Sequence, residues 1–86
     1  MITRIVHLQF KDEFMPALLL QLPEIKKTVR SQVGCNELKI VHSEKGNSVF
    51  TVSIWDSEID LNNYRDSDEF KKIWGFFKPN FVAKPE

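Results

Sequence analysis

The sequence predicts one α+β domain with a ferredoxin-like, split βαβ order, in which an antiparallel sheet carries its helices on one face. Three observations lead to this fold class. Hydrophobicity alternates at the start of the chain, and a long amphipathic stretch follows. Two β-rich segments on either side of a short turn then precede two further helical segments. The 86 residues are expected to form a single domain, residues 1–86.

The alternation from Ile2 to Phe10 predicts the first strand, because successive side chains on a strand point to opposite faces. One face holds Ile2, Arg4, Val6, Leu8 and Phe10, and the other holds Thr3, Ile5, His7 and Gln9. We expect His7 to point toward the helices and the face with Val6 and Leu8 to point away from them. The face with Val6 and Leu8 is too apolar to stay in water. A second copy of the sheet, related by a two-fold axis, is its simplest cover, so the sequence predicts a homodimer through sheet faces.

Apolar residues at spacings of four, four, three and four predict a long helix after this strand, with the stripe Phe14, Leu18, Leu22, Ile25 and Val29. Asp12 is its expected N-cap. Pro23 lies inside the stripe and predicts either a kink or two helices in tandem, because proline removes a backbone hydrogen bond. Gly34 fits the left-handed position that ends a helix.

The remaining segments predict a hairpin and two helices. Residues 36–43 and 48–55 read as antiparallel strands joined by a turn at residues 44–47. Asp56 or Ser57 is expected to cap the next helix, and Ser67 opens another that runs through Phe77. Residues 81–83 are expected to form a weak fourth strand.

The segment from Ile54 to Trp74 carries the most information about function. Its strand end and two helices are predicted to bring Trp55, Tyr64, Phe70 and Trp74 near one another. This aromatic surface is larger than packing alone explains, so we interpret it as the wall of a ligand pocket.

Composition narrows the classes of function. Lys plus Arg and Asp plus Glu both number 12, and a net charge of zero argues against nucleic-acid and membrane-surface partners. Cys35 is the single cysteine, so a reducing, cytoplasmic location is expected. No apolar run approaches the ~20 residues of a membrane span. Two histidines and one cysteine, far apart in sequence, suggest no metal site.

Three stretches of the chain resemble the antibiotic biosynthesis monooxygenase family of dimeric α+β barrels. They are the strand IVHLQF, the junction Val33-Gly34-Cys35, and the run from Trp55-Asp56-Ser57-Glu58 through Leu61, Tyr64, Ser67 and Phe70 to Trp74. The resemblance covers nearly all of the chain, and it implies a dimeric α/β barrel with a pocket between sheet and helices. The family includes cofactor-free quinone-forming monooxygenases, haem-degrading enzymes, aldol-type and lactone-type enzymes and quorum-signal processing proteins.

The haem-degrading branch of that family uses an Asn, a Trp and a His at the positions of His7, Tyr64 and Trp74. All three residues differ here, and an indole cannot ligate iron. The resemblance therefore implies no haem site of that type, and we expect no cofactor.

Within the implied pocket, His7 is the candidate catalytic base, because an imidazole can remove a proton from a phenol near neutral pH. The alternative is a hydrogen-bonded or partly exposed strand histidine. Tyr64 is expected either to hold a ligand oxygen or to pack its ring on the sheet with its hydroxyl in water. Trp74, Phe70 and Trp55 are candidate substrate-binding residues. For each the alternative is core packing, and for Trp55 also the contact between subunits.

The leading hypothesis is cofactor-independent oxygenation of a small aromatic or quinol-like compound, since an activated phenolate can react with dioxygen without metal or flavin. Two alternatives stay open. The chain could be a non-catalytic small-molecule-binding or interaction homodimer, or an isomerase- or lyase-type member that uses the pocket for proton transfer.

Overall fold

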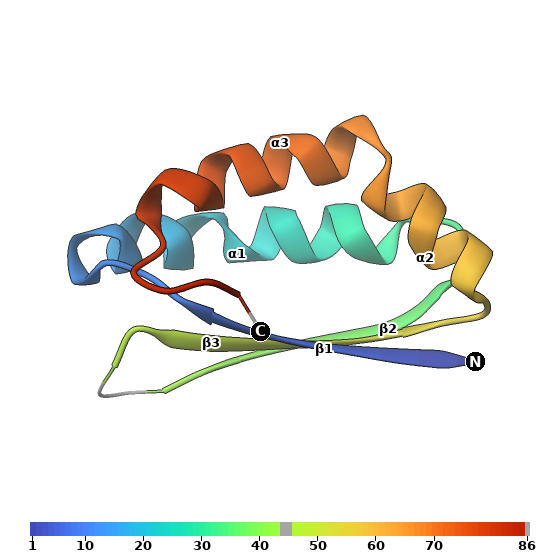
Figure 1. Ribbon diagram of the computed structural model, residues 1–86, viewed down its shortest axis with the longest axis horizontal. Helices are drawn as coiled ribbons and strands as arrows, with labels where there is room; N and C mark the ends of the chain where they lie inside the picture. The colour runs from blue at the N-terminus through green and yellow to red at the C-terminus, as the bar shows by residue number, and fades with distance from the viewer. Residues whose placement is uncertain (44–45, 86) are drawn as a thin grey trace.

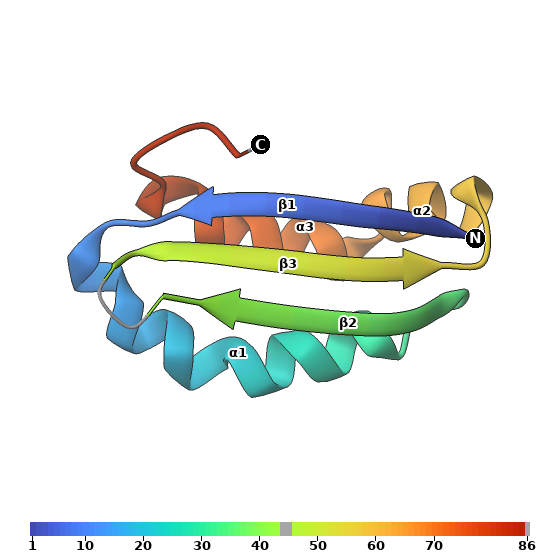
Figure 2. The ribbon, with the colours of Figure 1, turned by 90° about the horizontal axis from the view of Figure 1, so that it is seen from below.

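The structure is a computed structural model that describes residues 1–43 and 46–85. Its elements are β1 (Ile2–Gln9), α1 (Met15–Arg30), β2 (Cys35–His42), β3 (Ser48–Trp55), α2 (Glu58–Arg65) and α3 (Asp68–Phe77), with 3-10 turns at Asp12–Phe14 and Lys78–Asn80. The predicted α+β, ferredoxin-like fold is confirmed. The three helices lie on one side of an antiparallel sheet whose strand order is β1-β3-β2 (Figures 1 and 2).

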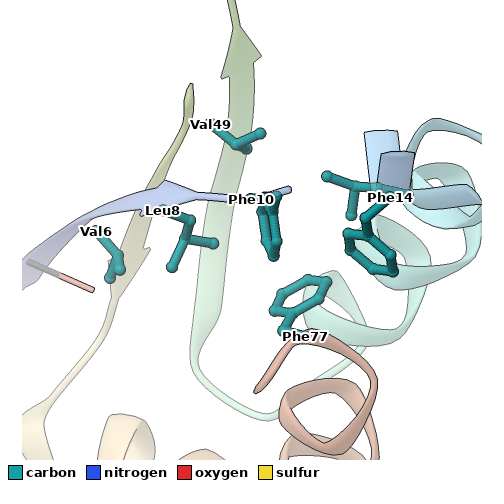
Figure 3. Packing of buried hydrophobic residues seen from close by; sticks show 7 residues of the cluster. Val6, Leu8, Phe10, Phe14, Val49 and Phe77 are labelled. Carbon is teal, nitrogen blue, oxygen red and sulfur yellow. The ribbon is translucent and has the colours of Figure 1, made fainter. Parts of the chain in front are cut away.

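The strand register fixes which side chains meet the helices. Leu8 lies opposite Val49, and Val6 lies opposite Thr51. Val6, Leu8 and Phe10 are 8%, 2% and 0% exposed and join the core. Figure 3 shows these side chains on the same side as Phe77 of α3. The predicted orientation of β1 is therefore wrong: Val6, Leu8 and Phe10 face the helices.

The opposite face of the sheet carries the other set of side chains and has no helix over it (Figure 2). On this face Ile5 is 63%, Val41 57% and Phe50 42% exposed. His7 lies here too, paired with Phe50 across β1 and β3. The sheet does have an uncovered apolar face, as expected, but Ile5, Val41 and Phe50 form it. Val6, Leu8 and Phe10, which were predicted for that face, lie in the core.

The helix boundaries follow local capping chemistry. The backbone N–H of Asp60 donates to the Ser57 hydroxyl at 3.2 Å, and the N–H of Phe70 donates to the Ser67 hydroxyl at 3.1 Å. Each hydroxyl satisfies a backbone donor in the first helical turn. Both predicted serine caps are confirmed. For α2 the prediction allowed Asp56 or Ser57, and the cap is Ser57. Asp12 is not a cap, because residues 12–14 form a 3-10 turn and Phe14 precedes α1.

Helix α1 runs as one helix from Met15 to Arg30 with Pro23 inside it, so the tandem-helix alternative is wrong. Gly34 has a φ of +84°, as expected for the left-handed residue after a helix. Its carbonyl accepts a hydrogen bond from the Asp56 N–H at 2.8 Å. A Cβ at this position would lie within 2.5 Å of the Cβ and Cγ of Asp60, so the turn before β2 and the start of α2 touch through a glycine.

The hairpin strands lie within one residue of their predicted bounds, whereas two residues of the predicted turn, 44 and 45, lie outside the described residues. The expected fourth strand is reduced to a single bridge between Phe10 and Phe81. The Val82 N–H donates to the Gln9 carbonyl at 3.0 Å, which ties this segment to the free edge of β1.

Candidate functional site

A small internal cavity of about 50 Å³ lies between the sheet and the helices. Its wall is mostly apolar, with side chains from all three strands and all three helices. Four polar groups interrupt that wall: Arg4, Thr51, Ser53 and Tyr64. A cavity that binds benzene measures roughly 150 Å³. The cavity therefore admits a few water molecules or one end of an aromatic compound, and a whole ring system needs space beyond it.

Arg4 is the charged residue of this cavity. It lies on β1 between Ile2 and Val6, so its side chain enters the helix-covered face. Its Cζ lies 6.0 Å from the centroid of the Phe70 ring, within range of a cation–π contact. Burial lowers the pKa of the guanidinium, although arginine stays protonated at physiological pH. The guanidinium forms no ion pair with a described residue. Among residues 1–43 and 46–85, the one ion pair within 4.0 Å joins Lys39 and Glu37.

Tyr64 brings the second polar group from α2. The residue is 6% exposed and lines the cavity with Arg4. Burial raises the pKa of its phenol to about 12, while the positive charge of Arg4 acts in the opposite direction. At neutral pH the hydroxyl therefore keeps its proton and can donate it in a hydrogen bond. A fixed cation and a neutral hydroxyl that line one cavity form a site suited to an oxygen anion.

The four aromatic residues singled out in the sequence do lie together, as a contiguous row. Ring centroids are 5.1 Å apart for Trp55 and Tyr64, 5.2 Å for Tyr64 and Phe70, and 5.4 Å for Phe70 and Trp74. Trp55 is fully buried, and its indole N–H donates to the Ser53 hydroxyl at 3.0 Å. Trp55 thus supports the Tyr64 ring from behind and does not line the cavity. Trp74 does line it, and Phe70 lies at its Arg4 end.

His7 is the clearest disagreement with the sequence-based site. Its ring stacks on Phe50 with centroids 4.4 Å apart and planes 5° from parallel. Its Nε2 lies 3.2 Å from the Ser48 hydroxyl oxygen. All three residues lie on the sheet face without helices, because their strand positions are opposite in parity to those of Val6 and Leu8. His7 is thus separated from the cavity by the sheet itself, and its predicted orientation toward the helices is wrong.

Sequence reasoning missed Arg4 as a pocket residue. A single arginine among aliphatic residues on a strand was a usable signal, since a buried cation requires a partner or a ligand. Cys35 and His42 lie elsewhere: burial raises the pKa of the Cys35 thiol, and His42 is exposed at the end of β2. Within residues 1–43 and 46–85 no group of three His, Cys, Asp or Glu side chains gathers as a metal site. None of the described helices has the length and hydrophobicity needed to cross a bilayer.

Comparison with known proteins supports this picture of the fold. The family model described as antibiotic biosynthesis monooxygenase matches residues 1–74. A crystal structure of an antibiotic biosynthesis monooxygenase superposes with a TM-score of 0.91 at 14% identity, covering 100% of this chain and 92% of that one. A conserved protein from Methanosarcina mazei Go1 gives 0.86 at 20% identity, covering 98% and 85%. Rv0793 from Mycobacterium tuberculosis gives 0.86 at 17% identity, covering 98% and 86%. No curated protein matches the sequence.

Proposed function

Because this chain belongs to the antibiotic biosynthesis monooxygenase family, we propose that it is a cofactor-independent monooxygenase for a small aromatic, quinol-like compound. The observation that carries the proposal is the meeting of the cation Arg4 and the phenol of Tyr64 in a mostly apolar cavity. Apolar walls suit a ring system, and the two polar groups suit the single oxygen that must bear negative charge.

Arg4 and Tyr64 have distinct roles in this proposal. The guanidinium of Arg4 favours the ionised form of a phenol or enol, because it supplies positive charge in a desolvated place. The Tyr64 hydroxyl donates a hydrogen bond to the same oxygen. Trp74 forms a wall against which the ring lies. Ionisation of the substrate is the activating step, since the anion is the species that gives an electron to dioxygen.

Anthrone serves as a model substrate whose reaction balances without a further reagent. Loss of one C–H proton gives the enolate, which passes an electron to dioxygen and recombines at carbon to form a C–O bond. The resulting hydroperoxide loses the second C–H hydrogen as a proton while the O–O bond breaks. Hydroxide and proton leave as water, and a carbonyl remains. The carbon is oxidised by four electrons, and one dioxygen accepts them.

A second candidate function is a non-catalytic binding protein, and one observation favours it. The residues that line the cavity include no imidazole and no carboxylate among those described. A binding protein needs no base, whereas an isomerase or lyase does. The oxygenase proposal meets this point because Arg4 lowers the pKa of the bound substrate, and the proton can pass to water.

We also propose that two copies pair through the uncovered sheet face. Ile5, Val41 and Phe50 are large apolar residues exposed there, and the half-buried Val52 and Ile54 lie on the same face. A patch of this kind on an 86-residue chain is a typical homodimer interface. The ring of His7, stacked on Phe50, would then lie within the contact between subunits.

Oxygen uptake with anthrone in metal-free, chelator-treated buffer tests the catalytic proposal. We expect uptake above the spontaneous rate. Arg4→Gln is expected to lower kcat/KM roughly 30-fold, the effect of removing one charged donor to a developing anion. Tyr64→Phe is expected to lower it about tenfold by removing a neutral donor.

Lys72→Gln is the matched control. Lys72 is an exposed residue of α3 and does not line the cavity. Its replacement by Gln removes the same unit of positive charge as Arg4→Gln. Unchanged uptake in both Arg4→Gln and Tyr64→Phe would remove the site assignment. Saturable binding of anthrone without any uptake would support the binding protein instead.

A further inference from the structure

A second hollow, open to solvent, lies where the edge strand β1 meets α3. It is a cleft of about 460 Å³ lined by Arg4, Arg65, Phe70, Lys71, Trp74, Gly75 and Lys78. Four of these seven residues are cations, two are aromatic, and no acid is among them. The whole chain has a net charge of zero, so this cleft concentrates positive charge that is balanced elsewhere on the surface.

None of the four cations that line the cleft forms an ion pair within 4.0 Å with a described residue. The one ion pair within 4.0 Å among residues 1–43 and 46–85 joins Lys39 and Glu37 on the far face of the sheet. Burial is the main cause that lowers the pKa of Arg4, and Tyr64 acts in the opposite direction. The positive charge of Arg65 lowers this pKa further, so the two guanidinium groups repel each other. Like charges held together without a counterion destabilise the folded chain, and a bound anion would relieve that repulsion.

The cleft is also shaped for a ring. Phe70 and Trp74 form its apolar side, with centroids 5.4 Å apart and planes tilted by 33°. Arg4 and Trp74 line both this cleft and the internal cavity, so these two side chains lie between the two spaces. A bicyclic compound is too large for the 50 Å³ cavity, whereas the 460 Å³ cleft has room for it beside Arg4 and Trp74, which the two spaces share.

We propose that this cleft binds small aromatic acids, with the ring on Phe70 and Trp74 and the carboxylate among Arg4, Lys71 and Lys78. A carboxylate matches the fork of Arg4, and the two lysines add charge at the mouth. The inference rests on the proposed function for the fate of the bound compound, and it narrows that compound to a ring that carries both a phenolic oxygen and an acid group.

Equilibrium dialysis with 1-hydroxy-2-naphthoate and the neutral 1-hydroxy-2-naphthamide tests this directly. The two probes share ring and phenol and differ in charge. We expect the acid to bind about tenfold more tightly. The difference should shrink when the salt concentration rises from about 0.05 to about 0.5 M, because the Debye length shortens. Equal binding of acid and amide, or no binding of either, would overturn the proposal.

Adjacent lysines on α3 provide the decisive pair of variants. Lys71 lines the cleft, whereas Lys72 lines the groove between α1 and α3 on the other side of the helix. Lys71→Gln is expected to weaken the acid about threefold and to leave the amide unchanged. Lys72→Gln should change neither. Equal losses in both variants would show a diffuse charge effect and no defined site.

Arg4→Gln should weaken the acid about tenfold, with circular dichroism to verify that this half-buried variant folds. If it does not fold, the comparison of exposed Lys71 and Lys72 still decides the matter. Tighter binding of tripolyphosphate than of the acid would overturn the aromatic class in favour of a polyanion site.

The outcome separates this inference from the proposed function. Preference for the acid without oxygen uptake by any quinol would leave the cleft assigned and the oxygenase proposal wrong. Oxygen uptake with neutral anthrone but no preference for the acid would leave the oxygenase proposal standing and this inference wrong.

Discussion

The two faces of the sheet are built from the same three strands but handle polar groups in opposite ways. The covered face buries Leu8 and Val49 and holds a lone guanidinium, Arg4, at a cavity. The open face exposes Ile5 and Phe50, and its two side-chain charges, Lys39 and Glu37, lie 3.6 Å apart as an ion pair. An unpaired charge on a covered face indicates a ligand, whereas apolar side chains on an open face indicate a partner chain.

The largest expected effect separates the faces by stability. Leu8 and Ile5 are aliphatic residues on one strand, 2% and 63% exposed. Leu8→Ala should cost about 2–5 kcal/mol at every protein concentration, because it leaves a cavity in the core. Ile5→Ala should cost less than about 1 kcal/mol in the monomer.

Urea denaturation over a range of protein concentrations measures both variants. The loss in Ile5→Ala should grow with concentration as the dimer becomes populated in the parent chain. Equal losses in Leu8→Ala and Ile5→Ala at high dilution would contradict the assignment of the two faces.

The next effect concerns the open face alone. Phe50→Lys would place a charge inside the proposed contact between subunits, where desolvation weakens association by roughly 3 kcal/mol, more than a hundredfold. Leu20→Lys is the control, since Leu20 is 78% exposed on α1 and lies away from the sheet. Sedimentation equilibrium should find Phe50→Lys monomeric and Leu20→Lys dimeric. A dimer that survives Phe50→Lys would require another interface.

The smallest expected effect is the pH dependence of stability, which tests the Tyr64 hydroxyl on the covered side. The folded pKa of Tyr64 is about 12, against about 10 for a free phenol. Below pH 10 both states keep the proton; above it the unfolded chain loses the proton first, so stability falls as pH rises toward 12. From about pH 9 to about 11.5 the free energy of unfolding should fall by about 2 kcal/mol more in the parent than in Tyr64→Phe.

Tyr64 is the single tyrosine, so the absorbance of its phenolate reports its ionisation without interference. The charge of Arg4 lowers this pKa, and Arg4→Gln should therefore raise it further. A titration midpoint near that of free tyrosine, unaffected by Arg4→Gln, would show that the hydroxyl does not lie in the cavity beside the guanidinium.

Local signals in the sequence were sufficient for the hairpin and for the starts of α2 and α3. Ser57 and Ser67 cap helices as their spacing predicted, because a cap depends only on residues a turn away. Pro23 was overestimated as a breaker: packing of the stripe on either side of it keeps α1 in one piece. The aromatic row was also predictable, since the two helices follow directly after Trp55.

The direction of β1 could not be predicted, and the predicted orientation of His7 depended on it. Alternation shows that two faces exist but does not say which one meets the helices when both are apolar. Val6, Leu8 and Phe10 are more apolar than the opposite set with His7 and Gln9, and they are the set buried in the core. Placing Arg4 on the outer face and His7 on the inner one followed from assigning the set with Val6 and Leu8 to the contact between two sheets. The register with Val49 on β3, a long-range feature, decides the matter.

Gly34 has an effect that reaches beyond its own turn. Its missing Cβ lets Asp60 sit against the backbone, and Asp60 lies one helical turn before Tyr64. Any larger residue at this corner would displace the start of α2 and move the phenol relative to the guanidinium. The position of the chain's one tyrosine is thus tied to a backbone contact four residues before it on the same helix, and the absorbance of its phenolate would report a change at that corner.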